Sequence, residues 1–270
     1  KLTIANLSQI LDLDPGNLSK IEQGKLKPSL PVLIKYSNYF KVSIDNLVGQ
    51  SSVDFISAFR SAAPYIYHYR NKIFVIAFDG FALESNSFVN LCTDINLLHS
   101  LGIKIILIHG IRPFIDLRLD KNNIKSRFHK HQRITTAEMM PHIIETNGLV
   151  KTKIEAVLSS NIYHNNIFKS ELKISSGNFL MAKPRGVIDG VDMEQTGFIR
   201  EINHEAIIEK LNHNEIVIMS PIGYSPIGEI FNLSFESSAS KIASSIQAEK
   251  LIYITENNGV QNIRGEYISE

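Results

Sequence analysis

The chain has 270 residues, of which 44% are apolar and 20% are charged, and its 28 Lys and Arg against 27 Asp and Glu give a formal charge of +1. This composition indicates a soluble globular protein with one or two packed cores, and it excludes a disordered tail, a collagen-like repeat and a polybasic nucleic-acid arm. No apolar stretch reaches the roughly 18 to 20 residues of a membrane span. A single cysteine, Cys92, excludes an intrachain disulfide and a multi-cysteine metal site, so we expect a cytoplasmic protein without a metal.

Residues 1–50 are predicted to form several short helices, which are stable only when packed on one another. Apolar residues at helical spacing mark the buried faces, as Leu7 and Leu11 do in the first helix. In the second helix, Asp14 is a capping residue and Pro15 occupies the first helical position. The four helices are expected to begin near Thr3, Asp14, Ser29 and Ile44.

These helices, with Asn-Leu-Ser-Lys-Ile-Glu-Gln-Gly at 17–24 and Lys-Pro-Ser-Leu at 27–30, resemble the lambda-repressor-like helix-turn-helix family. The resemblance implies DNA as a partner, a recognition helix over 14–24, and a family helix that would precede Lys1. The alternative is a helical module that does not bind DNA, because six lysines against four carboxylates leave only +2 and no arginine is present for guanine contacts. The implied DNA contacts are Pro15, Gly16 and Asn17 in the major groove, and Ser19 and Lys20 near phosphate.

Residues 51–71 are predicted to hold a linker and a leading helix over 53–69. Apolar residues, including Ile56 and Phe59, share one face of this helix. Pro64 is expected to interrupt it, because proline lacks the N–H that a helix interior needs. This face carries more apolar surface than an isolated helix should expose, which indicates a protein partner.

From Lys72 onward, apolar strands alternate with amphipathic helices. Strands such as 103–109 are apolar without alternation, which indicates burial on both faces, and the helical crossovers imply a parallel sheet. The segment 167–202 is expected to form an antiparallel hairpin region. We predict a three-layer α/β domain with a mainly parallel sheet, preceded by a small all-α domain. Strands are expected at 73–78, 103–109, 216–219 and 251–255, and helices at 88–101, 113–119, 137–158, 205–211 and 237–247.

The turns after the first two strands lie at the sheet edge where ligands bind in open α/β folds. They read Asp79-Gly80-Phe81 and Gly110-Ile111-Arg112-Pro113. With several later motifs, residues 53–270 resemble the amino acid kinase family, most closely the amino-terminal domain of bacterial N-acetylglutamate synthases. The resemblance implies the three-layer amino acid kinase-like fold. The later motifs include Ser176-Gly177-Asn178-Phe179, Gly186-Val187-Ile188-Asp189-Gly190, Phe231-Asn232-Leu233-Ser234 and Ala248-Glu249-Lys250.

Three positions depart from the pattern of the active kinases in this family. Ala77 stands where the kinases carry a lysine, and Asp79 stands where they carry a glycine of a phosphate-facing turn. Ile111 and Arg112 replace glycines of the second turn. Phosphoryl transfer depends on positioned charge and converging backbone N–H groups, so we predict a kinase fold without kinase activity. Arg112 can bind phosphate, but we favour a carboxylate partner for it in a filled pocket.

The resemblance also implies a vestigial substrate pocket. Arg133 matches the family arginine that holds the substrate carboxylate, with a surface ion pair as its alternative, and Asn232 matches an asparagine on the same ligand. Glu236 stands where kinases carry an organising aspartate, and Thr136 replaces another family aspartate. The expected pocket residues are Gly110, Arg112, Arg133 and Asn232.

Arginine-sensitive members of the family bind L-arginine beside the leading helix. Tyr65 and Lys250 match an aromatic residue and a lysine of that site. An aromatic face suits a guanidinium and a lysine suits a carboxylate, so the resemblance implies feedback by L-arginine. It also implies homo-oligomers, dimers or hexamers, in which the helix over 53–70 interlaces subunits.

The leading hypothesis is the regulatory part of an N-acetylglutamate synthase, the first enzyme of arginine biosynthesis. Acetyl transfer from acetyl-CoA would belong to a domain after Glu270, so no catalytic residue and no cofactor are expected in this chain. Its divisions would be 1–50 for the helix-turn-helix module, 51–71 for the linker and leading helix, and 72–270 for a kinase-like domain cut short at its carboxyl end. The alternatives are an acetylglutamate kinase and an arginine-responsive transcriptional regulator.

Overall fold

A computed structural model describes residues 3–47, 53–84, 87–160, 172–255 and 259 of the chain. The chain divides into two units, Lys1–His68 and Tyr69–Glu270. Among the described residues, no helix combines the length and apolar character needed to cross a bilayer.

The first unit begins with four short helices, as the sequence predicts. Thr3 caps the first with its hydroxyl, which accepts from the Asn6 N–H at 3.3 Å, and Asp14 caps the second by accepting from the Asn17 N–H at 2.8 Å. Leu7, Leu11 and Leu18 form the small core, with Leu13 and Tyr36 packed against it. The helices are α1 (Ile4–Leu11), α2 (Pro15–Glu22), α3 (Leu30–Phe40) and α4 (Ile44–Leu47).

Helix α5 (Val53–Tyr69) is continuous, with Pro64 inside it. The expectation that Pro64 interrupts this helix is therefore wrong. A proline removes one helical hydrogen bond and leaves one carbonyl without its partner. Residues 56–65 are all exposed, so water can hydrogen-bond to that carbonyl.

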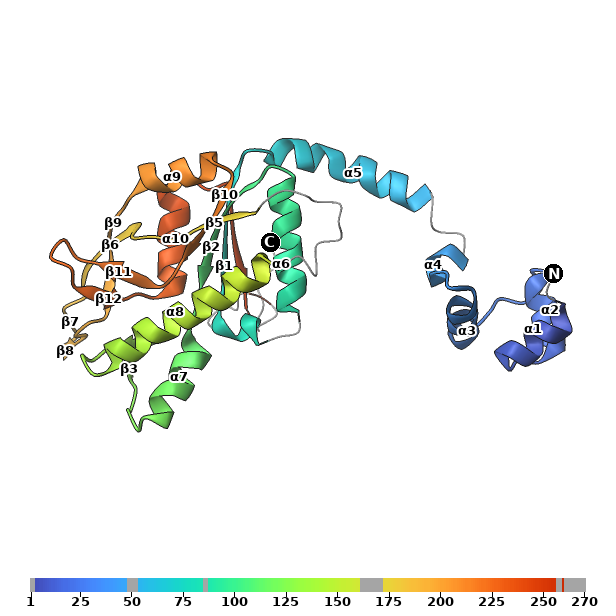
Figure 1. Cartoon of the computed structure of the whole chain (residues 1–270), viewed down its shortest axis with the longest axis horizontal. Coiled ribbons are helices and arrows are strands. Elements are labelled where there is room, and N and C mark those ends of the chain that lie inside the picture. The colour runs from blue at the N-terminus through green and yellow to red at the C-terminus, as the bar shows by residue number, and fades with distance from the viewer. Residues whose placement is uncertain (1–2, 48–52, 85–86, 161–171, 256–258, 260–270) are drawn as a thin grey trace. The chain divides into compact units, whose positions relative to one another are not determined.

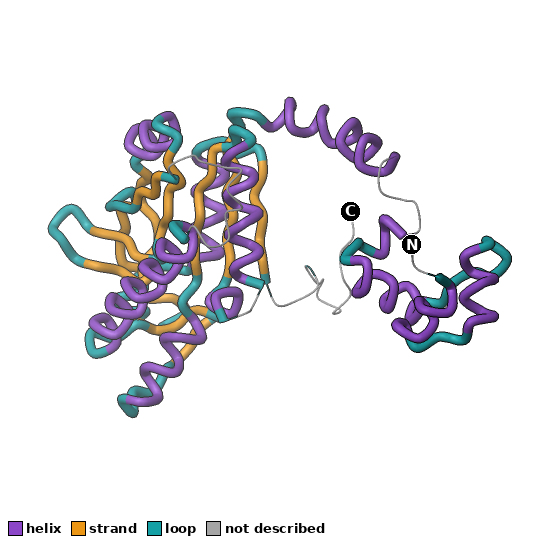
Figure 2. The backbone as a smooth tube through the Cα atoms, turned by 45° about the vertical axis from the view of Figure 1, so that its right-hand side comes forward, coloured by secondary structure: helices purple, strands orange, loops and turns teal. Residues whose placement is uncertain are grey.

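The second unit is built on a five-stranded parallel sheet of order β13-β1-β2-β10-β5. Figure 2 shows its strands running side by side next to the helices. The predicted strands are all present within one or two residues. The expectation of an antiparallel region over 167–202 is wrong in part, because the strand at 173–175 pairs in parallel with β10; residues 167–171 lie outside the described residues. The strands are β1 (Ile73–Phe78), β2 (Lys104–His109), β5 (Lys173–Ser175), β10 (Glu215–Met219) and β13 (Lys250–Ile254).

Helices cover both faces of this sheet, which confirms the three-layer α/β fold (Figure 1). In β1, Phe74, Ile76 and Phe78 point into one apolar core, whereas Val75 and Ala77 point into the other. This alternation follows from the two-residue period of a strand. The first core is completed by α6 (Phe88–Ser100), α7 (Arg112–Lys121) and α8 (Met139–Leu158), and the second by α9 (His204–Asn212) and α10 (Phe235–Ser245).

Shorter strands and one turn of 3-10 helix extend the carboxyl edge of the sheet. A second sheet has the order β12-β11-β6-β9, and two small hairpins, β3–β4 and β7–β8, stand beside it. The pairs β6–β9 and β7–β8 are antiparallel, as expected for their part of 167–202. The elements are η1 (Gly80–Leu83), β3 (Arg127–His129), β4 (Gln132–Ile134), β6 (Leu180–Pro184), β7 (Val187–Ile188), β8 (Val191–Asp192), β9 (Gly197–Ile202), β11 (Ile222–Tyr224) and β12 (Ile230–Asn232).

Candidate functional site

The turn after β1 is closed by the carboxylate of Asp79. This side chain accepts hydrogen bonds from the backbone N–H groups of Phe81 at 3.1 Å and Ala82 at 3.3 Å. Ala77, where a kinase has its lysine, is fully buried in the apolar core. The turn therefore supplies no cation, and its two converging N–H groups are already occupied by a negative charge.

The turn after β2 is packed tightly against its neighbours. A Cβ on Gly110 would lie 3.0 Å from the Phe235 ring and 3.2 Å from the backbone of Asp79, so only glycine fits here without displacement. Ile111 precedes α7 with its side chain buried, and Arg112 begins that helix. Phosphate-cradling turns use glycines so that backbone N–H groups can converge on the ligand, and the bulk of Ile111 removes that freedom.

A cavity of about 130 Å³ lies beside this turn. Room for one water requires only about 10 to 15 Å³, so the cavity has space for a small metabolite. Gly110, Arg112, Arg133 and Asn232 all line it. The structure thus brings together the four pocket residues predicted from the sequence, and their binding role stays a prediction. Other lining residues include Phe128, Gln132, Thr196, Ser234 and Glu236.

The side chain of Arg133 is surrounded by other residues that contact its guanidinium. Its guanidinium donates to the Asp116 carboxylate and to the Ser126 hydroxyl, and it lies 4.8 Å from the centre of the Phe128 ring. The ion pair that is the alternative for Arg133 is therefore present, although the arginine itself is only 8% exposed. Sequence reasoning missed these partners, because the short β3–β4 hairpin that places Phe128 and Arg133 has no strand pattern.

Arg112 is exposed at the mouth of the cavity. Its guanidinium lies 5.3 Å from the centre of the Phe128 ring, on which it can stack. Within the described part of the chain, no carboxylate lies within 4.0 Å of its guanidinium, so a carboxylate partner for Arg112 stays a prediction. Among the described residues, the charge of Arg112 is available to an anion that enters the cavity.

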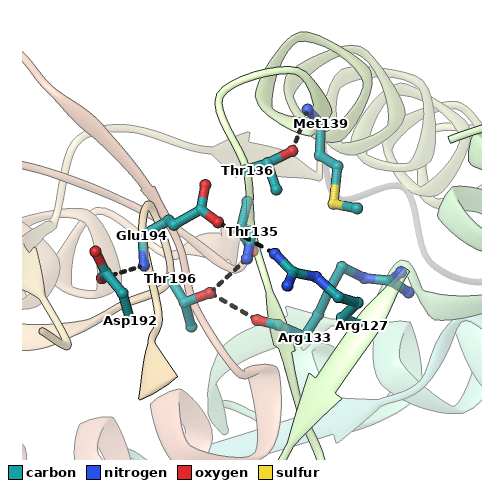
Figure 3. A network of polar contacts seen from close by, with 8 residues as sticks. All are labelled: Arg127, Arg133, Thr135, Thr136, Met139, Asp192, Glu194 and Thr196. Carbon is teal, nitrogen blue, oxygen red and sulfur yellow. Dashed lines mark hydrogen bonds and ion pairs between the residues drawn. The ribbon is translucent and has the colours of Figure 1, made fainter. Parts of the chain in front are cut away.

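A polar network joins the floor of the cavity to the second sheet (Figure 3). The Thr196 hydroxyl donates to the Arg133 carbonyl at 2.6 Å and accepts from the Thr135 N–H at 3.0 Å. Asn232 donates from Nδ2 to the Thr135 hydroxyl at 2.9 Å, so its amide is held toward the network. An ion pair between Arg127 and Glu194, with 3.6 Å between the nitrogen and the oxygen, lies beside this network.

The two positions where the kinases carry aspartates have structural partners here. The Thr136 hydroxyl accepts from the Met139 N–H at 3.4 Å, at the start of α8 (Figure 3). Glu236 stands in the first turn of α10 and accepts from the Ser234 hydroxyl at 2.7 Å. A carboxylate near a helix N-terminus is stabilised by the helix dipole. Glu236 also lines the cavity, so it adds negative charge to one side.

His109 ends β2 directly below the Gly110 turn and is fully buried. Its Nε2 lies 2.9 Å from the Ser220 hydroxyl. Burial, with the nearby charge of Lys151, lowers the pKa of His109 from 6.5 to about 4. The imidazole is therefore neutral at pH 7. Among the described residues, no group of three His, Cys, Asp or Glu side chains is arranged to hold a metal.

The predicted effector residues belong to different units of the chain. Tyr65 lies on α5 and is 66% exposed. Lys250 begins β13, and its ammonium lies 5.5 Å from the centre of the Tyr69 ring. Binding of one ligand by Tyr65 and Lys250 together stays a prediction.

The predicted DNA contacts lie at the start of helix α2. Pro15, Gly16, Asn17 and Lys20 are exposed, whereas Ser19 is half-buried. The Ser19 hydroxyl accepts from the Gln23 side chain at 3.2 Å. The N-terminal turn of α2 therefore presents small and polar groups to solvent, and contact of these residues with DNA stays a prediction.

The second unit thus combines a kinase-type α/β fold with phosphate-facing turns that are closed. The sequence model of the Amino acid kinase family matches residues 72–268, and that of the Helix-turn-helix family matches residues 1–47. The chain belongs to the amino acid kinase family.

Curated relatives and solved structures are similar to most of this chain. The Amino-acid acetyltransferase of Serratia proteamaculans (strain 568) is 39% identical over 221 residues, which are 82% of this chain and 50% of that protein. N-acetylglutamate synthase from Neisseria gonorrhoeae, in complex with coenzyme A and L-arginine, matches with a TM-score of 0.73 and 36% identity over 78% of this chain and 50% of that chain. Its complex with coenzyme A and N-acetyl-glutamate gives a TM-score of 0.70 at 37% identity, over 78% and 48% of the two chains. The chain spans about half the length of the curated relatives it matches.

Proposed function

We propose that this chain is the kinase-like regulatory part of an N-acetylglutamate synthase, the amino-acid N-acetyltransferase that begins arginine biosynthesis. The observation that carries the proposal is 39% identity to an amino-acid acetyltransferase over 82% of the chain. In this proposal, transfer of the acetyl group from acetyl-CoA to L-glutamate takes place in a part of the protein outside these residues. The catalytic residues and the acetyl-CoA site of the proposed synthase would lie in that other part.

The closed turns support a domain that no longer transfers phosphate. Asp79 places a carboxylate on the N–H groups of Phe81 and Ala82, and Ala77 brings no positive charge. Phosphoryl transfer is mainly a matter of positioning and of stabilising negative charge, so both changes act against it. The cavity lined by Arg112 and Asn232 remains a place where a small carboxylate can bind without reaction.

L-arginine is the proposed effector. The Neisseria gonorrhoeae relative has been crystallised with L-arginine. Tyr65 offers an exposed aromatic face for the guanidinium, and Lys250 offers an ammonium for the carboxylate. Exposed apolar residues on α5, among them Ile56, Phe59 and Tyr67, suit the proposed interlacing of α5 between subunits of a homo-oligomer.

Two measurements on the full chain test this function. In a coupled ATP assay with N-acetylglutamate, we expect no turnover, and a rate near about one per second would overturn the loss of kinase activity. In a calorimetric titration, we expect saturable binding of L-arginine and no comparable binding of L-lysine. Failure of L-arginine to bind would overturn the effector assignment.

The helix-turn-helix match favours a second candidate, an arginine-responsive DNA-binding regulator. The observation that favours it is the match over residues 1–47 together with the exposed turn at Asn17 and Lys20. Sequencing the gene beyond the codon for Glu270 separates the candidates. An acetyltransferase pattern there supports the synthase, whereas a nearby stop codon supports the regulator.

A further inference from the structure

A second, smaller cavity lies between strand β9 and helix α10, with a volume of about 70 Å³. It is distinct from the cavity beside Gly110, although Leu233 and Ser234 line both. Two cationic side chains, Arg185 and Lys241, line the smaller one. Nothing in the proposed function uses either of them.

Among the described residues, the two cations of this cavity have no carboxylate as an ion-pair partner. The Nε atom of Arg185 is buried and has no hydrogen-bond partner. Within the residues that the structure describes, no carboxylate lies within 4.0 Å of the Arg185 guanidinium or of the Lys241 ammonium. A buried donor without a partner lowers stability, and more so when it is charged. An anion in the cavity would remove that cost.

Lys241 is held beside the cavity by the backbone. Its ammonium donates to the carbonyl of Ile199 in β9. An ammonium has three hydrogens, so further donors remain for a ligand. The lysine is thus positioned by the fold and still able to bind.

The start of helix α10 supplies neutral donors to the same cavity. Ser234 is its N-cap, and Ser237 and Ser238 of its first turn also line the cavity. Ser238 is only 2% exposed. The Ser234 hydroxyl accepts from the Ser237 N–H at 3.1 Å and donates to the Glu236 carboxylate at 2.7 Å, so its proton is already used and the serine donors for a ligand are Ser237 and Ser238. The positive end of an eleven-residue helix adds to the attraction for negative charge.

We propose that this cavity binds a phosphate-class oxyanion, either inorganic phosphate or the head of a small phosphomonoester. The two cations, with the hydroxyls of Ser237 and Ser238, give donors from several directions, which suits the tetrahedral arrangement of phosphate oxygens. The volume admits the anion itself and excludes a nucleotide. A groove along α10, bordered by Ser240 and Ser244, adjoins the cavity through Ser237 and Lys241, and it leaves space for the alcohol part of a monoester.

The test is calorimetric titration of the full chain with inorganic phosphate, and separately with glycerol phosphate, at constant ionic strength. We expect saturable binding of at least one of the two and no heat of binding from chloride. Arg185→Gln and Lys241→Gln are each expected to weaken the affinity by about tenfold or more, because each removes a charged donor. If glycerol phosphate binds more tightly than inorganic phosphate, the groove along α10 binds the alcohol part of the ester.

Arg200→Gln is the matched control, because Arg200 is an exposed arginine of β9 that lines neither cavity. It is expected to leave phosphate affinity unchanged. Lys241 is exposed on α10, so its variant keeps the test decisive if Arg185→Gln does not fold. Absence of saturable binding by both probes would overturn the proposal, and so would equal weakening by Arg200→Gln.

Discussion

Arg133 and Asp116 form an ion pair between strand β4 and helix α7, in which the arginine side chain is 7% exposed and the aspartate side chain 43% exposed. The charge of Arg133 is thus balanced inside the protein. A carboxylate ligand at Arg133 has to compete with Asp116, whereas Arg112 on the same cavity has no such competitor among the described residues. The first anchor for an anionic ligand in the cavity is therefore Arg112.

Replacing Asp116 tests the structural role of this pair. Asp116→Asn leaves a nearly buried guanidinium without its counter-charge, so we expect the free energy of unfolding to fall by about 1 to 3 kcal/mol. Urea denaturation at pH 7 measures the loss. Asp120→Asn is the control, because Asp120 is an exposed carboxylate on the same helix. A loss no larger than in the control would show that the pair contributes nothing to stability.

His109 makes stability depend on pH. Because burial lowers its pKa from 6.5 to about 4, the unfolded chain binds a proton between these values and the folded chain does not. Stability from this residue is complete above pH 6.5 and is lost as the pH falls toward 4, by roughly 3 kcal/mol in total. Urea denaturation from pH 7 to pH 4 measures the slope, and His109→Gln should remove this part of it. A slope identical in the two proteins would refute the assignment.

The exposed aromatic face of Tyr65 is the proposed platform for L-arginine. Tyr65→Ala should weaken the affinity by about three- to thirtyfold, the range expected for one cation–π contact. Tyr67→Ala on the same helix removes an even more exposed tyrosine, 86% against 66%, and should have no effect. Calorimetry with L-arginine measures both. Equal affinities of the wild type and Tyr65→Ala would place the effector elsewhere.

Lys20 on helix α2 is the proposed phosphate contact on DNA. Lys20→Ala should weaken binding to DNA fragments evenly across sequences and reduce the slope of log affinity against log salt by about one. Fluorescence anisotropy over a salt series measures the slope. Lys35→Gln is the control, because Lys35 donates to the Asp12 carbonyl at 2.9 Å within the unit. A DNA affinity that does not change with salt concentration would count against the helix-turn-helix as a DNA-binding module.

The sequence predicts the elements that have strong local patterns. Ile73–Phe78 is an uninterrupted apolar run, so burial on both faces follows directly, and Asp14-Pro15 marks the start of α2. The parallel pairing of strand β5 could not be predicted, because its three residues, Lys173, Ile174 and Ser175, are too few and too mixed in polarity to show a strand period. In the β3–β4 hairpin, Lys130 and His131 adopt left-handed backbone conformations that ordinarily indicate glycine or asparagine.

The candidate site depends on contacts between distant segments. Arg133 and Asn232 are 99 positions apart in the chain, and family resemblance rather than spacing puts them in one pocket. Asp116 has nothing in its surroundings in the sequence to indicate a bond to Arg133. Likewise Arg185, which follows β6, and Lys241 of α10 are 56 positions apart and line one cavity only through the packing of distant segments, so no local motif reveals it.

Strand β1 belongs to both apolar cores, because its alternate residues face opposite sides of the sheet. If β1 unfolds, both apolar cores lose residues. One helical layer therefore cannot unfold with β1 while the other layer keeps its full packing. The kinase-like unit should unfold in a single cooperative transition, with coincident midpoints by far-ultraviolet circular dichroism and by tyrosine fluorescence.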